Sequence, residues 1–554
     1  MTDRDLTQTE IQRAFESRGD GPWTVVHDEV NAEGVRGGSY CALADPGRRG
    51  DALGRDSWLA TKSDGGPGFA QMYEDGQPVA IYLPRGKVDE DVELLVLVRD
   101  FHGAADPVLE IDQQFRLFHN LRYVAASDSY VKMNDDGTET AAVRITGETI
   151  EIRTSLLKQY IAARQMDLLL FTDMHVYSHQ QPAGADTVRF TTASCTGRLD
   201  HHENRRSSLG RYSSRYCATK VIAPGPVETC GIWPYETADS AYPAFIIGED
   251  QHGRPVTHTC DPAVLGNYFG ANPDAPHYLT PVHFRREVLA KYYADSQRYT
   301  VSDGYLRCAQ LWGLQIDNDH DDRVVVFLGD LGRDLPPAER DHWRSYMMSA
   351  DAPISVTNFR RSFLAQPADA AAVDLTFRRV YHDATRAWEA RHGWPLFREP
   401  NGSDVFLLQQ LRIPLNDTDN EFEEAIKLLA KLMSDALNEK AIGKELPDRV
   451  ENEKGISKLQ RLLTLWGYPH VQRDISFLRR VQELRSKVSA HLKGRTYEQD
   501  LTKNLGDVRG PAAVQNLLGE GVTFLRDLIA WVGPAVAAET ATESATEAEP
   551  APGT

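Results

Sequence analysis

An arginine and a histidine stand close together near the carboxyl end of one apolar-periodic segment. Arg485 and His491 fall in the stretch LRSKVSAHLKG, residues 484–494. A histidine with a pKa near neutrality can take a proton from a ribose 2′-hydroxyl and give one to the leaving 5′-oxygen. A planar guanidinium can hold two oxygens of the phosphate between them. These two residue types therefore suit metal-independent cleavage of RNA.

The spacing of the two residues limits how they can act together. Six positions along an ideal α-helix turn a side chain by about 240°, so Arg485 and His491 would lie on different faces. They can converge at a helix end, or at an interface where two copies of the segment meet. We therefore expect a homodimer or a larger even-numbered oligomer with a two-fold axis near this helix. A competing interpretation is that both residues belong to an ordinary solvated helix face.

Amphipathic segments within residues 401–537 give the Arg-His pair its setting. Apolar residues recur there at helical spacing, and stripes of this kind pack against one another in helical bundles. The segments are residues 419–440, 452–467, 474–492 and 512–533. Arg485 lies in the third of these four. The final residues, 538–554, are poor in large apolar side chains, which predicts a disordered tail.

The third segment resembles the HEPN superfamily, helical bundles whose signature is an arginine, four to six intervening residues and a histidine. The matching stretch is RSKVSAH, where Ser486 takes a place that is more often Asn, Asp or His. The resemblance covers about residues 420–535. It implies metal-independent endoribonuclease activity, dimerisation through the bundle, and catalysis by Arg485 and His491 with Ser486 beside them. Because some HEPN domains are inactive, it also leaves open a dimerisation or RNA-binding module in a sensor or scaffold protein.

Charge is distributed unevenly along the chain. The net charge of −19 at pH 7 opposes non-specific attraction to nucleic acid. Residues 451–500 differ, because ten Lys and Arg there outnumber six Asp and Glu. This local excess predicts a surface for single-stranded or tRNA-like RNA around the Arg-His pair. Its candidate RNA-binding residues are Arg480, Lys487, Lys493 and Arg495.

The residues before the bundle follow other patterns. Residues 1–260 hold short β-type runs between Gly, Pro and Asp, and residues 261–400 mix helical and strand patterns, which predicts an α+β protein. A large front part joined to a small ribonuclease bundle resembles prokaryotic antiviral (antiphage) defence effectors. In those proteins the front part senses an invader-derived trigger or restrains the nuclease. Alternatively, the chemistry lies in the front part and the bundle only assembles it.

Three polar stretches in the front part admit both a functional and a structural interpretation. Residues 199–220 hold Arg205, Arg206 and Arg211 among tyrosines, which suits an anionic partner, and a solvated surface loop explains them as well. DNDHDDR (317–323) lacks the spacing of a calcium loop and is predicted to be a polar turn between strands. GDLGRD (329–334) is predicted to be a turn with glycine at positive φ after a buried strand.

Targeting and cofactor motifs are missing from the sequence. The amino-terminal residues are acidic without an apolar core, and the longest apolar runs are strand-sized, so no membrane association is expected. No stretch has the spacing of a Walker loop, a dinucleotide fingerprint or a common metal site, so we expect neither cofactor nor metal. Six cysteines without a Cys-x-x-Cys pair favour free thiols and a cytoplasmic protein.

Overall fold

The computed structural model describes residues 16–32, 34–54, 59–60, 67–83, 89–181, 187–203, 209–233, 242–349, 352–488 and 497–533. The chain forms two compact units, unit 1 (residues 1–240) and unit 2 (residues 241–554). The sequence patterns predicted boundaries at residues 260 and 400 instead. In the structure the mixed segment and the helical bundle belong to one unit. The predicted tail, residues 538–554, lies outside the described residues.

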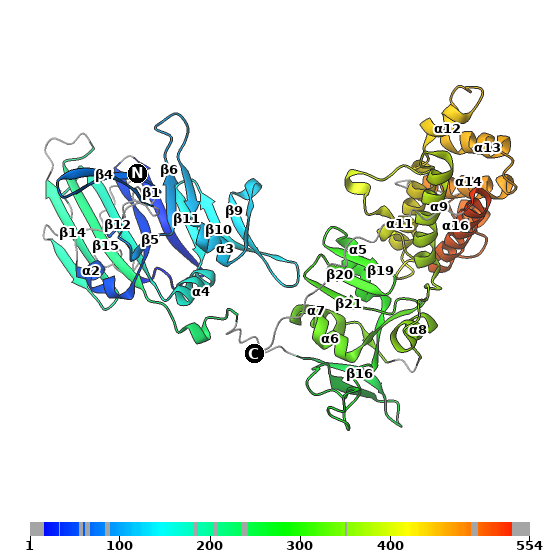
Figure 1. Cartoon of the computed structure of the whole chain (residues 1–554), viewed down its shortest axis with the longest axis horizontal. Helices are drawn as coiled ribbons and strands as arrows, with labels where there is room; N and C mark the ends of the chain where they lie inside the picture. The colour runs from blue at the N-terminus through cyan, green and yellow to red at the C-terminus, as the bar shows by residue number, and fades with distance from the viewer. Residues whose placement is uncertain are drawn as a thin grey trace. The chain divides into compact units, whose positions relative to one another are not determined.

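Antiparallel strands dominate unit 1 (Figure 1). Eleven strands form one sheet in the order β13-β14-β15-β12-β2-β1-β11-β10-β9-β8, with β5 paired to β2 beside this path. The bounds are β1 Trp23–Ala32, β2 Val35–Ala44, β5 Val92–Leu94, β8 Leu121–Val124, β9 Ser129–Met133, β10 Glu139–Thr146, β11 Thr149–Arg153, β12 Asp167–Ser178, β13 Val188–Thr191, β14 Cys195–Glu203 and β15 Tyr212–Ile222. The expected β-rich character of the front part is confirmed.

Helices cover the sheet of unit 1 on both faces near β12. The side chains of Leu168 and Leu170 pack in one core with helix α4, whereas Leu169 and Phe171 pack in a second core with helix α2. Burial on both faces explains why β12 begins with an unbroken apolar run rather than an alternating pattern. The smaller elements are η1 Pro46–Arg48, α2 Arg49–Gly54, β3 Gly68–Glu74, β4 Gln77–Leu83, β6 Val96–Arg99, β7 Val108–Ile111, α3 Gln113–Phe118, η2 Ala125–Ser127, α4 Thr154–Arg164 and η3 Val227–Thr229.

Short sheets and helices make up the amino-terminal part of unit 2. Strand β18 lies between β22 and β23, β20 lies between β19 and β21, and β16 pairs with β17. Aromatic side chains fill their core, where Phe284 meets Trp343 edge to face. The elements are β16 Ala244–Glu249, β17 Pro255–Thr259, β18 Pro281–Arg285, η4 Arg286–Leu289, α5 Ala290–Ala294, β19 Tyr299–Ser302, β20 Tyr305–Cys308, β21 Trp312–Gln315, β22 Arg323–Phe327, α6 Leu328–Asp334, α7 Pro337–Arg344, β23 Met347–Met348 and α8 Val356–Leu364.

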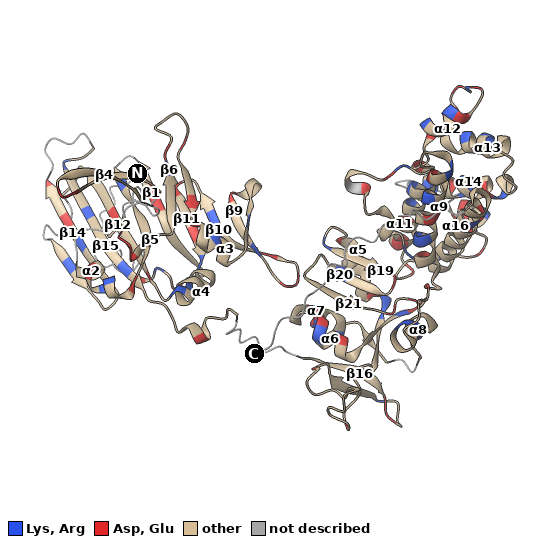
Figure 2. Cartoon of the chain, in the orientation of Figure 1, with Lys and Arg blue, Asp and Glu red and all other residues tan. Residues whose placement is uncertain are grey.

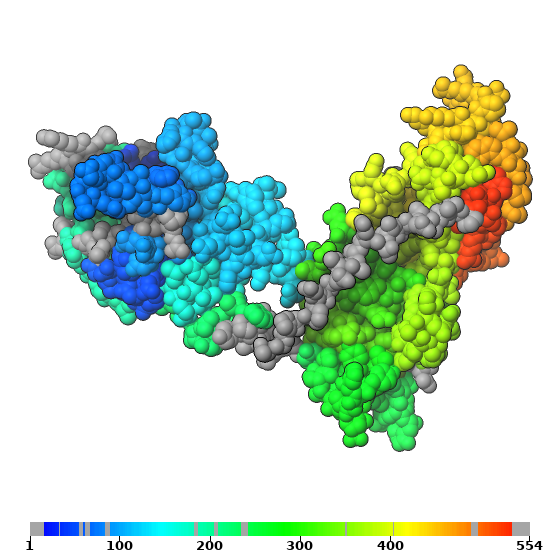
Figure 3. Space-filling model, in the orientation of Figure 1, coloured from blue at the N-terminus to red at the C-terminus, as the bar shows by residue number. Residues whose placement is uncertain are grey.

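Helices are the main elements in the rest of the described part of unit 2, which is coloured yellow-green to red in the space-filling view (Figure 3). Their bounds are α9 Val373–His392, η5 Gly402–Asp404, α10 Leu407–Gln410, α11 Asp419–Ala430, the π-helical segment η6 Lys431–Asp435, α12 Glu439–Glu445, α13 Gly455–Leu465, α14 Val471–Val488, α15 Tyr497–Leu505 and α16 Gly510–Val532. Arg378 of α9 donates to the carbonyls of Val301 and Leu411, and this joins the helices to the short sheets.

The four predicted amphipathic segments contain helices α11, α13, α14 and α16, and their apolar stripes share one core. The long helix α9, which we expected in the mixed segment, packs in the same core along α16. A Cβ at Gly521 of α16 would lie 2.7 Å from the Phe377 ring of α9, so glycine permits this close approach. The helical part is therefore larger than the expected four-helix bundle.

Candidate functional site

The last described turn of α14 carries three of the predicted site residues, Arg485, Ser486 and Lys487. Val481, Leu484 and Val488 are buried in the helical core, and this fixes the helix so that Arg485 faces outward. The Arg485 side chain is 33% exposed, and its Nη1 donates to the carboxylate of Asp435 at 2.7 Å. His491 lies outside the described residues, so its position relative to Arg485 stays a prediction.

Asp435 also belongs to the candidate site, although no sequence pattern pointed to it. It ends η6, where one π-helical turn interrupts the segment that we expected to be a single helix. The Asp435 backbone carbonyl accepts a hydrogen bond from Arg398 Nη2 at 2.6 Å. The carbonyl and the carboxylate of Asp435 therefore each bind a guanidinium. Single π-helical turns occur frequently at functional sites. Asp435 therefore orients Arg485 at the surface of the bundle.

The neighbours of Arg485 on α14 bind groups of their own chain. The Ser486 hydroxyl donates to the Gln482 carbonyl one turn earlier at 3.0 Å, as serine commonly does within a helix. Lys487 pairs with Asp500 of α15 at 2.7 Å. Arg480 pairs with Glu520 of α16. Lys493 and Arg495 lie outside the described residues.

The positive excess counted for residues 451–500 is reduced by acids that lie outside this segment and pair with its basic side chains. Figure 2 shows Lys and Arg interspersed with Asp and Glu over the helices of unit 2. The pairs that involve this segment include Lys458–Glu439, Arg461–Glu453, Arg473–Asp527, Arg480–Glu520, Arg485–Asp435 and Lys487–Asp500. Exposed ion pairs contribute about 0–1 kcal/mol each, so a phosphate can displace them. The local positive charge around Arg485 is nevertheless weaker than the residue count predicted.

The arginine-rich stretch 199–220 is mainly an antiparallel hairpin of β14 and β15 and not a surface loop, so the predicted loop is wrong over most of its length. Arg211 pairs with Glu203 at 2.9 Å, whereas Arg205 and Arg206 lie outside the described residues. His201 and His202 are consecutive strand residues, so their side chains point to opposite faces of the sheet and cannot share a metal ion.

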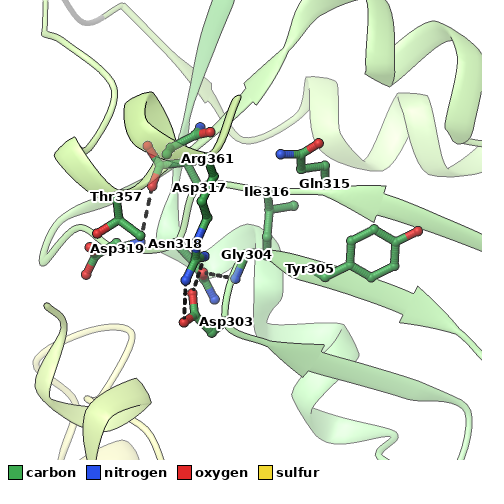
Figure 4. Close-up of a pocket in the computed structure, with 11 residues that line it drawn as sticks. Asp303, Gly304, Tyr305, Gln315, Ile316, Asp317, Asn318, Asp319, Thr357 and Arg361 are labelled. Atoms are coloured by element: carbon green, nitrogen blue, oxygen red, sulfur yellow. Dashed lines mark hydrogen bonds and ion pairs between the residues drawn. The ribbon is translucent and has the colours of Figure 1, made fainter. Parts of the chain in front are cut away.

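The acidic turn 317–323 lies between β21 and β22, as predicted, and it borders a cavity of about 320 Å³ (Figure 4). The Asp317 carboxylate accepts the backbone N–H of Ser355 at 2.7 Å and His320 Nε2 at 3.1 Å. The Asp319 carboxylate accepts the N–H groups of Ala371 and Ala372, just before α9. These carboxylates therefore anchor the segments that begin α8 and α9.

Arg361 is the cation of this cavity, and it too has structural partners. Its guanidinium donates to both carboxylate oxygens of Asp303 at 2.7 and 2.8 Å and to the carbonyl of Ala368. Because its charged groups are bound to one another or to backbone, the cavity is a polar junction between the short sheets and the helices. We assign it a role in stability and not in ligand binding.

The stretch GDLGRD belongs to helix α6, so the predicted turn is wrong. Its glycines are needed for close packing and not for positive φ. A Cβ at Gly329 would lie 2.1 Å from the Tyr278 ring, and one at Gly332 would lie 1.9 Å from the Cys260 carbonyl oxygen. Asp330 accepts the Tyr278 hydroxyl at 2.9 Å. A phosphate loop is excluded here because the helix is buried against protein.

A buried histidine beside the acidic turn predicts acid sensitivity. Burial, followed by the nearby Arg323 and His320, lowers the pKa of His283 from 6.5 to about 4. The unfolded chain therefore binds the proton more readily, so this stabilisation is complete above about pH 6.5 and is lost as the pH falls towards 4. His283→Leu should remove roughly 3 kcal/mol of the pH dependence of unfolding over this range. Denaturant unfolding followed by tryptophan fluorescence at several pH values measures it.

The exposed His252 provides the matched control for this experiment. His252→Leu should leave the pH dependence as it is in the original chain. A pH dependence that is the same in His283→Leu and in the original chain would show that other groups cause the acid sensitivity.

Comparisons with known proteins give no further guide to the site. The scan against protein-family models found no match, and the searches of curated proteins and of solved structures found none either. Among the described helices, none has both the length and the apolar character needed to cross a membrane.

Proposed function

We propose that the chain is a metal-independent endoribonuclease of HEPN type, which acts as an antiviral defence or toxin effector under the control of its amino-terminal region. The observation that carries the proposal is the geometry of Arg485. Its guanidinium is 33% exposed and has a fixed carboxylate partner, and it lies in the last described turn of a helix whose other face packs in the core.

Cleavage of one phosphodiester requires three actions: removal of a proton, donation of a proton, and stabilisation of the charge on phosphate. His491, alone or with a second copy, removes the proton of the 2′-hydroxyl and protonates the 5′-oxygen that leaves, while the 2′-oxygen forms a new bond to phosphorus. Arg485 holds the non-bridging oxygens, on which negative charge accumulates. Asp435 binds Nη1 of Arg485, and a guanidinium has five N–H donors, so the contacts of the described residues leave Nε and Nη2 to bind the phosphate.

A turnover assay tests the proposal directly. The purified full-length chain should cleave single-stranded RNA repeatedly in the presence of EDTA, because no step requires a metal ion. Cleavage that stops with EDTA and returns with added metal would contradict the mechanism.

A second candidate function has its own supporting observation. The described basic side chains Arg480, Arg485 and Lys487 are all paired with acids of the same chain. Such a neutralised surface favours a catalytically inactive bundle, which would serve as a dimerisation module or, where phosphates displace the acids, as an RNA-binding module. In that case the EDTA assay shows RNA binding, or no interaction with RNA, but no cleavage.

Both candidate functions predict a dimer. If Arg485 and His491 come from different faces of one segment, two copies are needed to place both groups at one phosphate. Sedimentation should therefore show a homodimer or a larger even-numbered oligomer, and specific cleavage activity should fall on dilution as the oligomer dissociates. A monomer with full activity at nanomolar concentration would contradict the shared site.

A further inference from the structure

Three side chains of unit 1 that offer metal-ligand atoms meet beside strand β1. They are His27, Glu29 and Glu148, and their ligand atoms all lie within 4.8 Å of one another. His27 is 1% exposed, Glu29 is partly buried and Glu148 is exposed, so the group reaches from the interior of the sheet to solvent. The proposed ribonuclease chemistry uses none of these residues.

The strand arrangement explains why these residues converge. His27 and Glu29 are two positions apart on β1, and side chains at this spacing point to the same face of a strand. His27 pairs with Ile150 near the start of β11, and this pairing brings Glu148, in the turn just before β11, close to His27 and Glu29. Glu148 lies in the two-residue turn between β10 and β11, where Gly147 takes a φ of +58°.

Neighbouring hydrogen bonds fix two of the three positions. The Tyr40 hydroxyl donates to Glu29 Oε1 at 2.7 Å, and the Tyr40 ring meets the His27 ring edge-on at 5.4 Å. The Thr149 hydroxyl donates to Asp28 at 2.9 Å and holds the turn that carries Glu148 against β1. Partners of this kind orient the ligands in protein metal sites and are important for their affinity.

We propose that His27, Glu29 and Glu148 bind one divalent transition-metal cation, with Zn²⁺ as the preferred ion. An imidazole nitrogen with two carboxylate oxygens suits Zn²⁺, whereas Mg²⁺ and Ca²⁺ prefer oxygen ligands alone. Ligand atoms around a tetrahedral Zn²⁺ lie about 3.4 Å apart, so the three groups need only a small movement to close on the ion. Water or substrate completes the fourth position, because the exposed side of Glu148 is open to solvent.

A bound cation would interact favourably with both carboxylates of this group. Two carboxylates that share a site repel each other, and a cation between them removes this repulsion. The metal joins β1 to the β10–β11 turn, and its binding should stabilise unit 1 in proportion to the free metal concentration. A protonated His27 between the two carboxylates is the arrangement that the experiment must distinguish from a metal site.

Calorimetric titration of the untagged, chelator-treated full-length chain with ZnCl₂ tests the proposal. One Zn²⁺ per chain should bind, with an increase in the melting temperature, and MgCl₂ should give neither effect. Glu148→Gln should weaken this binding at least about ten-fold, because it removes a charged ligand at an exposed position where the fold tolerates the change. The matched control is Glu151→Gln. Glu151 lies on the same hairpin, but it follows Ile150 directly, so its side chain points to the opposite face of the sheet. This variant should bind Zn²⁺ as the original chain does.

Equal binding of Zn²⁺ by the original chain and by Glu148→Gln would overturn the proposal, as would the absence of binding by the original chain. If His27 instead forms a protonated cluster, Glu148→Gln shifts the His27 titration seen by NMR while no Zn²⁺ binds. Because the readout is metal binding, the result is independent of whether the chain cleaves RNA.

Discussion

Replacement of Arg485 by alanine is expected to abolish RNA cleavage while leaving the fold intact. The guanidinium is 33% exposed and makes one surface ion pair, so its removal should cost the fold at most about 1 kcal/mol. Loss of one preorganised donor to the developing charge typically lowers kcat about 100- to 1000-fold. Single-turnover cleavage of a labelled RNA, with circular dichroism as the check on folding, measures the effect.

Variants around Arg485 separate catalysis from general charge. Arg479→Ala is the matched control, because Arg479 lies on the same helix and its described partner is Gln460. It should cleave RNA as the original chain does. Asp435→Asn keeps the size of the partner but weakens its hold on Arg485, so it should lower kcat by about ten-fold with little change in KM, and Asp435→Glu should restore part of the rate.

His491→Ala should abolish cleavage as Arg485→Ala does. Cleavage that persists in both variants would place the chemistry elsewhere in the chain. If the original chain binds RNA without cleaving it, and binding weakens equally in Arg479→Ala and Arg485→Ala, the bundle is an RNA-binding module.

Asp317→Ala should be the most destabilising substitution in the polar junction of unit 2. The side chain is 1% exposed, and it accepts hydrogen bonds from Ser355 N–H and from His320. Removal of one partner of a buried charged pair typically costs about 3–5 kcal/mol, because the remaining polar groups stay buried without an acceptor. Denaturant unfolding at pH 7 measures the loss.

The same carboxylate gives the junction a second acid-sensitive group. Burial raises the pKa of Asp317, but hydrogen bonds from His320 and Ser355 outweigh burial and hold the pKa below its ordinary value. Its stabilising contribution is therefore complete above about pH 4, the ordinary pKa, and is lost as the pH falls through the lowered one. Asp322→Ala is the control, since that side chain is 65% exposed in the same turn, and it should change stability by less than about 0.5 kcal/mol. Equal losses in the two variants would contradict the anchoring role.

The helices of unit 2 could be predicted because their signal is local. Ile475, Leu478 and Val481 recur at the helical period, and the structure buries all three in one core. The same rule applies to α9, whose buried residues Phe377, Val380 and Trp388 repeat at helical spacing. The periodic pattern of one helix does not show which helix it will pack against, so the packing of α9 along α16 was not predicted.

The polar contacts could not be predicted because they join distant residues. Asp435 and Arg485 are 50 residues apart, and Asp435 depends on a π-helical turn that has no simple sequence signature. His27 and Glu148 come together only through the pairing of β1 with β11. The glycines of α6 were misread for a related reason, since a glycine required by a neighbouring ring looks the same in sequence as a glycine required by a turn.

The order of strands in the large sheet also bears on how the chain is made. Ser39 of β2 and Thr172 of β12 are hydrogen-bonded neighbours that lie 133 residues apart in sequence. Strands β1 and β2 therefore leave the ribosome well before β11 and β12, so the hairpin that they form exposes unpaired outer edges in the meantime. Pairings over such distances form slowly, whereas the helices of unit 2 depend more on local contacts. Unit 1, which precedes the helices of unit 2 along the chain, is thus expected to fold more slowly than those helices, and chaperones and translation speed should affect the yield mainly through it.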